Sequence, residues 1–172
     1  GVRVQVTLEL PDGAGVRAVT VHSRPEDAPA DAPWTRHASG TVAPGTHRPA
    51  ARPGQWPPIG ATPVPVPEAY ERLAGAGLTL GPAFAGMRAA WRRGDELFAE
   101  TAHGADAPDA ARLDLHPALL DPALLALAPG TEDEPGGAYV RLAAAWRGVS
   151  AVPGPLTAAR VTLRVTDTDT LA

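Results

Sequence analysis

The segment from Leu115 to Leu127 reads LHPALLDPALLAL and places a single carboxylate, Asp121, inside an otherwise aliphatic run. A helix formed by this run is apolar nearly all round, so it has to be enclosed on most sides. A curved antiparallel sheet wrapped around a central helix provides that enclosure. An unpaired ionised carboxylate is costly to bury, so we expect Asp121 to be solvated, hydrogen-bonded or held protonated for chemistry.

The first 42 residues carry strand patterns. From Val2 to Leu10, valine and leucine alternate with polar residues, which predicts a strand with one buried face. Turn residues at 11–15 precede a second alternation at 16–22, so the two runs are expected to form an antiparallel hairpin. A third strand is expected at 34–42, after a loop rich in Pro, Asp and Ala at 23–33.

Prolines recur from Pro44 to Pro67, and they remove backbone donors and disfavour both a helix and a central strand. We interpret residues 46–67 as an extended linker. A short helix is expected at 67–74, with a proline near its start and Gly75 and Gly77 as its stop signals.

Strand patterns resume after this helix. Residues 87–91 and 97–101 flank Arg92-Arg93-Gly94-Asp95-Glu96, which predicts a second hairpin. After the aliphatic run, further strands are expected at 139–149 and 157–166. The second of these places Val161, Leu163 and Val165 on one face.

Three motifs resemble those of one known family. They are Gly81-Pro82-Ala83-Phe84-Ala85-Gly86, His116-Pro117-Ala118-Leu119-Leu120-Asp121 and Trp146-Arg147-Gly148-Val149-Ser150. In this order they resemble the dehydratase domain of modular type I polyketide synthases. The resemblance implies an α+β double hot-dog fold, in which an antiparallel sheet is wrapped around a central apolar helix, with the first half incomplete.

The resemblance also implies a domain organisation. Residues 1–45 would be the remainder of the first hot-dog half, residues 46–67 the proline-rich linker, and residues 68–172 the second half, which carries the aspartate motif. The opening of the chain resembles the interior of the family's first half. We therefore expect the chain to be a piece of a larger polypeptide, truncated at its N-terminus.

The function that the resemblance implies is removal of water from a β-hydroxyacyl group, giving an α,β-unsaturated thioester. This elimination needs a base for the proton next to the carbonyl and an acid for the departing hydroxyl. By resemblance Asp121 is the catalytic acid, and no metal or redox cofactor is required because the substrate is carried on the phosphopantetheine arm of an acyl carrier protein. The expected substrate-binding residues are His116, Leu80, Gly81, Pro82, Phe84 and Leu125.

The family's base is a histidine in a His-x-x-x-Gly-x-x-x-x-Pro motif, and none of the five histidines of this chain fits it. Leu80 and Leu125 also stand where the family usually has a tyrosine and a glutamine or histidine. Two interpretations follow: a dehydratase whose base lies upstream of Gly1, or a catalytically inactive pseudo-dehydratase that serves as a structural or dimerisation module. A third class is a stand-alone hot-dog thioesterase or hydratase, which the proline-rich linker disfavours.

Pro122 leaves the start of the central helix open. Proline is well placed at the first helical position and costs about 3 kcal/mol in a helix interior. If the helix begins at Pro122, Asp121 becomes its N-cap and is stabilised in its ionised form, which is the wrong direction for a general acid. If the helix begins earlier, Asp121 can face an acyl pocket.

Charge and composition limit the partners. The net charge is −4, and no basic patch extends beyond Arg92-Arg93, so nucleic acid is not an expected partner. No apolar run approaches the length of a membrane span, and the absence of cysteine excludes disulfides and thiol catalysis. We expect a cytoplasmic protein of antibiotic biosynthesis that works with an acyl carrier protein and neighbouring synthase domains and is homodimeric within the parent synthase.

Overall fold

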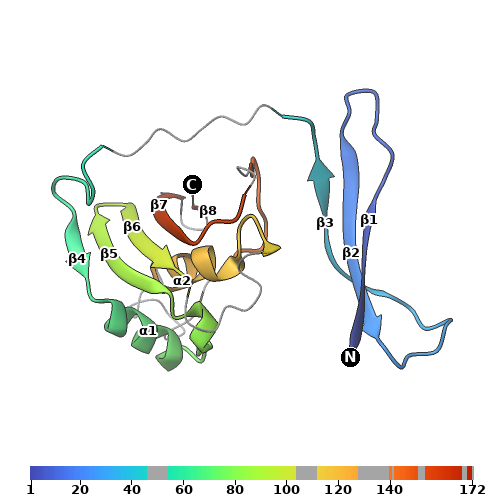
Figure 1. Ribbon diagram of the computed structural model, residues 1–172, viewed down its shortest axis with the longest axis horizontal. Coiled ribbons are helices and arrows are strands. Elements are labelled where there is room, and N and C mark those ends of the chain that lie inside the picture. Colours follow the sequence, from blue (N-terminus) through green and yellow to red (C-terminus); the bar gives the residue numbers. More distant parts are fainter. Residues whose placement is uncertain are drawn as a thin grey trace. The chain divides into compact units, whose positions relative to one another are not determined.

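The computed structural model of the 172-residue chain describes residues 1–45, 54–103, 112–127, 140, 142–150, 154–167 and 170–171. The chain forms two compact units, Gly1–Arg48 and Pro49–Ala172. Each unit is built on an antiparallel sheet (Figure 1).

The first unit is a three-stranded sheet in the order β1-β2-β3. The strands are β1 (Val2–Leu8), β2 (Arg17–Pro25) and β3 (Thr35–Val42). In the turn between β1 and β2, the Asp12 carboxylate accepts hydrogen bonds of 2.9 Å from the backbone N–H groups of Ala14 and Val16. The predicted hairpin and third strand are confirmed.

The prediction that β1 buries one face is wrong for the described part of the chain. Val2, Val4 and Val6 are 65%, 65% and 64% exposed. The described residues of this unit contain three strands and no helix, so nothing within the unit covers the apolar face.

The second unit has a five-stranded sheet in the order β4-β5-β6-β7-β8. Its strands are β4 (Thr62–Val64), β5 (Met87–Arg93), β6 (Glu96–Ala102), β7 (Ala158–Asp167) and β8 (Thr170–Leu171). Its helices are α1 (Val66–Gly75), the 3-10 turn η1 (Pro82–Phe84) and α2 (Pro117–Leu127). Among the described residues, these elements confirm the predicted short helix, the second hairpin, the central helix and the strand at 157–166.

The linker prediction for residues 46–67 needs a correction at its C-terminal end. Thr62–Val64 forms β4, which pairs with β5 at one edge of the sheet, and α1 already begins at Val66. Pro63 is tolerated in β4 because an edge strand can lack a backbone donor on its free side. Residues 46–53 lie outside the described part of the chain.

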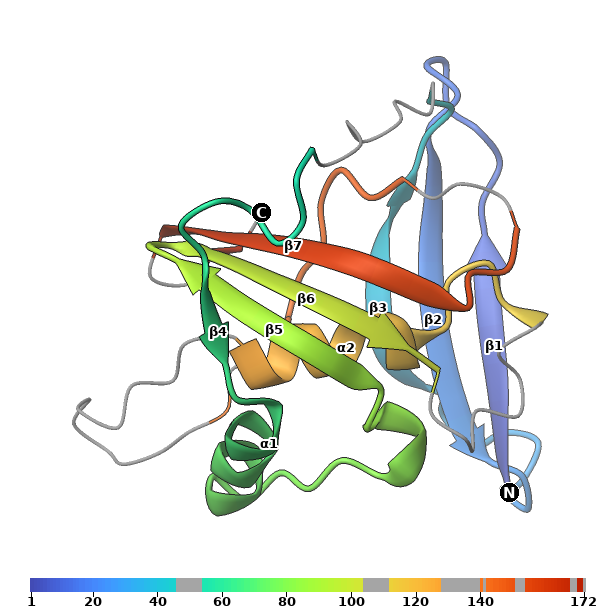
Figure 2. The same ribbon diagram turned by 60° about the vertical axis from the view of Figure 1, so that its left-hand side comes forward.

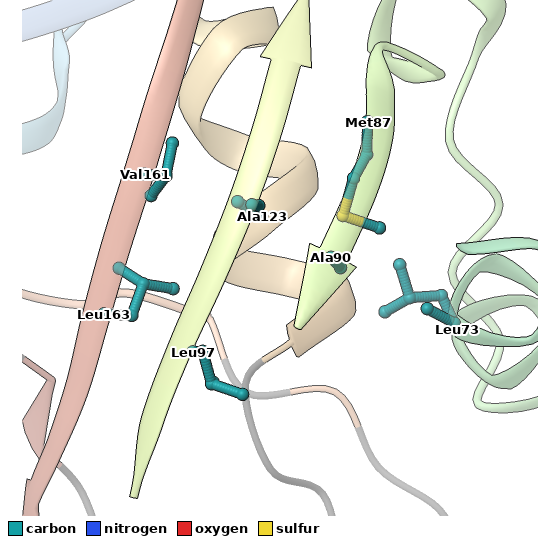
Figure 3. Packing of buried hydrophobic residues seen from close by; sticks show 9 residues of the cluster. Leu73, Met87, Ala90, Leu97, Ala123, Val161 and Leu163 are labelled. Atoms are coloured by element: carbon teal, nitrogen blue, oxygen red, sulfur yellow. The ribbon is translucent and has the colours of Figure 1, made fainter. Parts of the chain in front are cut away.

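Strands β5, β6 and β7 curve around α2 (Figure 2). The core lies between this sheet, α2 and α1, and Figure 3 shows side chains of all five elements meeting there. The labelled core residues are Leu73, Met87, Ala90, Leu97, Ala123, Val161 and Leu163. The curved sheet around the helix, which the sequence predicts, is therefore observed, and the buried residues of α2 are Ala118, Leu119, Pro122 and Ala123 among those whose side chains are described.

Alternation in β7 matches its burial. Val161 and Leu163 are 8% and 6% exposed, whereas Thr162 and Arg164 point to solvent. The strand predicted at 139–149 is wrong for residues 142–149, which adopt no regular structure. Tyr139 lies outside the described residues. Apolar composition alone could not distinguish an exposed irregular segment from a strand.

Candidate active site

Asp121 lies in the interior of α2 and is half-buried. Leu119 and Ala123, two residues before and after it, are completely buried, so Asp121 lies at the border of the buried face of α2. Burial raises the pKa of Asp121 above its ordinary value, because loss of solvent penalises the charged form. This direction is the one that a general acid requires.

The N-cap alternative for Asp121 is wrong. Helix α2 begins at Pro117, and Pro122 stands inside it. An interior proline cannot donate to the carbonyl four residues earlier, here Ala118, and costs about 3 kcal/mol in an isolated helix. Enclosure of the helix by the sheet and α1 supplies the packing that offsets this cost.

His116 caps the start of α2. Its Nδ1 atom accepts a hydrogen bond of 3.1 Å from the backbone N–H of Ala118, and its own carbonyl accepts one of 2.9 Å from Leu119 N–H. Pro117 occupies the first helical position, where a proline fits without losing a bond. The Nδ1 lone pair is therefore engaged in the cap, and the substrate-binding role of His116 stays a prediction.

A second histidine packs against this cap. The His103 ring lies 5.3 Å from the His116 ring, centroid to centroid, in an edge-to-face arrangement. Its Nε2 lies 2.8 Å from the carbonyl oxygen of Leu156, which can accept a hydrogen bond but not donate one. The proton on His103 is then on Nε2. Both imidazoles near the start of α2 thus have structural partners.

The Gly81–Gly86 motif forms one turn of 3-10 helix that contacts α2. The Phe84 N–H donates to the Gly81 carbonyl at 2.9 Å, and this bond closes the turn. Gly86 is buried, and a Cβ atom there would overlap the carbonyl oxygen of Ala102. Gly86 is needed because the start of β5 lies directly against the end of β6.

Tyr70 holds this motif in place, and sequence reasoning missed it. The Tyr70 hydroxyl donates to the Phe84 carbonyl at 3.1 Å and accepts from the Met87 N–H at 3.2 Å. Partial burial raises the pKa of Tyr70, so the hydroxyl keeps its proton at neutral pH. Its place beside the buried residues Ala69 and Leu73 of α1 was readable from the helical spacing, but its hydrogen-bond partners were not.

Thr101 of β6 was also missed. Its hydroxyl donates a 2.7 Å hydrogen bond to the carbonyl oxygen of Leu119 in α2, and the residue is 1% exposed. In the described part of the chain it is the one buried residue with a polar side chain. In the sequence it looks like an ordinary strand threonine.

The substrate-binding roles of the remaining predicted site residues stay predictions. Leu80 is partly buried against the core cluster, and Pro82 lies at the start of η1. The backbone of Leu125 belongs to α2, and its side chain is outside the described part of the structure. The structure therefore brings the Gly81–Gly86 motif and the aspartate helix into contact.

An open hollow of about 280 Å³ lies at the ends of β6 and β7, lined by charged and small residues. Its lining residues are Arg88, Glu100, Thr101, Ala102, Ala158, Ala159 and Arg160, and Asp121 is not among them. The acyl pocket expected at Asp121 stays a prediction. Within the described residues, no group of three or more His, Asp or Glu side chains is arranged to bind a metal ion. No helix there has the length and apolar character needed to span a membrane.

Comparison with known proteins adds independent information. Residues 48–171 match the family model described as the polyketide synthase dehydratase N-terminal domain. The chain is 44% identical to the spectinabilin polyketide synthase system protein NorA of Streptomyces orinoci, over 99% of this chain and 9% of that protein. It is 47% identical to the polyketide synthase GfsE of Streptomyces halstedii, over 99% of this chain and 5% of that protein.

Solved structures give the same answer for the fold. A dehydratase of the borrelidin and fluvirucin polyketide synthases superposes with a TM-score of 0.78 at 37% identity, over 99% of this chain and 58% of that one. The dehydratase domain from the terminal module of the rifamycin polyketide synthase superposes with a TM-score of 0.77 at 35% identity, over 99% of this chain and 60% of that one. The prediction of a hot-dog fold is confirmed, and the chain spans a little under two thirds of these solved structures.

Proposed function

The chain belongs to the polyketide synthase dehydratase family, and we propose from this premise that it provides the acid for removing water from a β-hydroxyacyl thioester. The observation that carries the proposal is Asp121, which is half-buried in the interior of α2 and has a raised pKa. A carboxylic acid that keeps its proton to higher pH than usual can give that proton to a departing hydroxyl group.

In this mechanism a base removes the proton next to the thioester carbonyl, and the electron pair of that C–H bond forms the new double bond. The C–O bond at the β carbon breaks, and Asp121 protonates the departing hydroxyl, which leaves as water. The products are an α,β-unsaturated thioester and an ionised Asp121, which regains a proton from the base or from solvent. Every proton is accounted for by acid–base chemistry alone, and no cofactor is invoked.

The base is not assigned to a residue of this chain. None of its five histidines stands in the family's motif. Three of the histidines have hydrogen-bond partners. The Nδ1 of His116 accepts a backbone hydrogen bond. The Nε2 of His103 lies 2.8 Å from the carbonyl oxygen of Leu156, and the Nε2 of His37 lies 2.6 Å from the Ser23 hydroxyl. The missing motif supports a division of labour in which Asp121 is the chain's contribution to the catalytic pair.

The proposed partner is an acyl carrier protein that presents the substrate on its phosphopantetheine arm. The similarity to polyketide synthases that are many times longer than this chain supports a place among neighbouring synthase domains. Homodimerisation and a cytoplasmic location are part of the same proposal. The proposed substrate-binding groups are those of the Gly81–Gly86 motif together with Leu80, His116 and Leu125.

The proposal is tested with the synthase polypeptide that we propose contains this chain, called the full-length protein below, and a β-hydroxyacyl group on its acyl carrier protein. Loss of water is followed by mass spectrometry. Replacing Asp121 by Asn should lower turnover by at least about 100-fold, because general acid catalysis is worth that much or more. The matched control is Asp95→Asn, an exposed aspartate in the turn between β5 and β6, which should leave turnover unchanged. Wild-type protein without turnover would instead favour a structural module.

A further inference from the structure

The first turn of α2 lacks one of the backbone hydrogen bonds that would tie it to the rest of the helix. Pro122 has no N–H, so the carbonyl of Ala118 lacks its usual intrahelical donor. This missing bond would have linked the turn before Asp121 to the turn that contains it. Other contacts must therefore hold the first turn at its place against the sheet.

Thr101 provides such a contact from a rigid position. It lies on β6, the central strand of the sheet, opposite Met87 of β5 and Ala159 of β7. Its hydroxyl donates to the carbonyl of Leu119, 2.7 Å away, in the turn that Pro122 weakens. Because both groups are buried, water is poorly placed to replace the bond.

The surroundings leave the first turn little freedom to settle elsewhere. Gly86 packs against the backbone of Ala102 so closely that a Cβ atom on Gly86 would overlap it. The same Cβ position is 3.6 Å from the carbonyl oxygen of Ala118, so the first turn of α2 also lies close to Gly86. His116 caps the same turn through Nδ1. The first turn is thus fixed at one end by its cap and from the side by Thr101, with Asp121 two residues beyond the Leu119 carbonyl.

We propose that Thr101 is a positioning residue for Asp121: its hydrogen bond to Leu119 replaces the hold on the first turn that Pro122 removes, and so keeps the carboxyl group at its half-buried place. The inference rests on the proposed role of Asp121 as the acid. It predicts an energetic coupling between Thr101 and Pro122, whereas a merely local hydrogen bond would act independently of Pro122.

The test is a double-mutant cycle of Thr101→Val and Pro122→Ala, with Thr101→Ser as the conservative variant. Valine keeps the shape of threonine and removes the hydroxyl, serine keeps the hydroxyl, and Pro122→Ala restores the backbone donor that the Ala118 carbonyl lacks. The first readout is the NMR titration of the Asp121 carboxyl in the full 172-residue chain. The second is kcat and KM for dehydration by the full-length protein.

With Pro122 present, Thr101→Val should move the Asp121 titration toward that of an ordinary aspartate, because the loosened turn admits water. It should lower kcat about tenfold with KM unchanged, since small misplacement of a catalytic group is costly. Thr101→Ser should behave as wild type. In the Pro122→Ala background, Thr101→Val should have less than about a twofold effect.

Two results would overturn the inference: an unchanged Asp121 titration in Thr101→Val, or equal effects of Thr101→Val in the two backgrounds. Thermal unfolding of each variant identifies any that fails to fold, and if Thr101→Val does not fold, Thr101→Ala, which also removes the hydroxyl, takes its place in the cycle. If the wild-type full-length protein shows no dehydration, the proposed function fails. The NMR titration still decides the role of Thr101 in that case.

Discussion

The two sheets of this protein share one sequence pattern and differ in what covers them. In β7, Val161 and Leu163 alternate with polar residues and are 8% and 6% exposed, because α2 packs against that face. In β1, Val4 and Val6 alternate with polar residues in the same way and are 65% and 64% exposed. Alternation therefore specifies a strand, and burial requires a partner element that the pattern does not itself supply.

The largest expected effect is at Gly86, which directly precedes β5 in the sheet that packs against α2. Gly86→Ala should destabilise the second unit by about 3 kcal/mol, since the new methyl group overlaps the Ala102 carbonyl oxygen and backbone has to shift. Urea unfolding followed by tryptophan fluorescence measures the change. Gly75→Ala is the control, because its Cβ would meet nothing within 4 Å. Equal stability of the Gly86 and Gly75 variants would show that β5 and β6 are not in such close contact.

The next effect compares the two sheets directly. Leu163→Ala should cost about 2 kcal/mol, because it removes buried side-chain volume from the core against α2. Val6→Ala should cost less than about 0.5 kcal/mol, as expected for an exposed position. Both are read from chemical denaturation under identical conditions. A similar cost for the two substitutions would mean that the apolar face of β1 is covered in solution, and the contrast between the sheets would disappear.

The smallest effect is a pH dependence of stability that arises from Asp121, on the helix that covers the second sheet. The pKa of Asp121 is raised by burial, so the folded protein holds this proton at pH values where the unfolded chain has released it. Stability therefore falls as pH rises from the ordinary aspartate pKa to the raised one, and the penalty remains above that window. Asp121→Asn should be more stable than wild type at neutral pH and should show no gain below the ordinary value.

Glu9 is exposed and directly follows strand β1. Glu9→Gln is therefore the control for this pH experiment. Stability is measured by urea unfolding across the acid to neutral range. If Asp121→Asn shows no pH-dependent gain over wild type, the carboxyl group is as solvated as Glu9, and the acid role proposed for it loses its support.

Much of the fold was readable from local pattern. Alternation located β1, β2 and β7, and the proline and glycine signals located α1 within one or two residues of its ends. The aliphatic run at Leu115–Leu127 predicted both α2 and the curved sheet around it. These predictions succeeded because period and turn chemistry are properties of short segments.

The site was predicted less completely. Asp121 was identified from its motif, and the two interpretations of Pro122 could not be separated, because a proline fits the first helical position and is tolerated inside a helix only when other elements support it. His116 was expected to bind substrate, and the structure shows it capping α2 through Nδ1. The bonds of Tyr70 and Thr101 join residues 14 and 18 positions apart, and no spacing rule predicts them.

The sequence by itself determined β1, β2, β3, the β5–β6 hairpin, β7, the two α-helices and the presence of one acid in an apolar helix, since these depend on residues near one another in the chain. Tertiary structure decided where α2 begins, how its first turn is held, and which apolar face is buried. Each of these depends on groups that meet only when the chain folds: the Thr101 hydroxyl at the Leu119 carbonyl, the Gly86 backbone at Ala102, and α2 on one sheet.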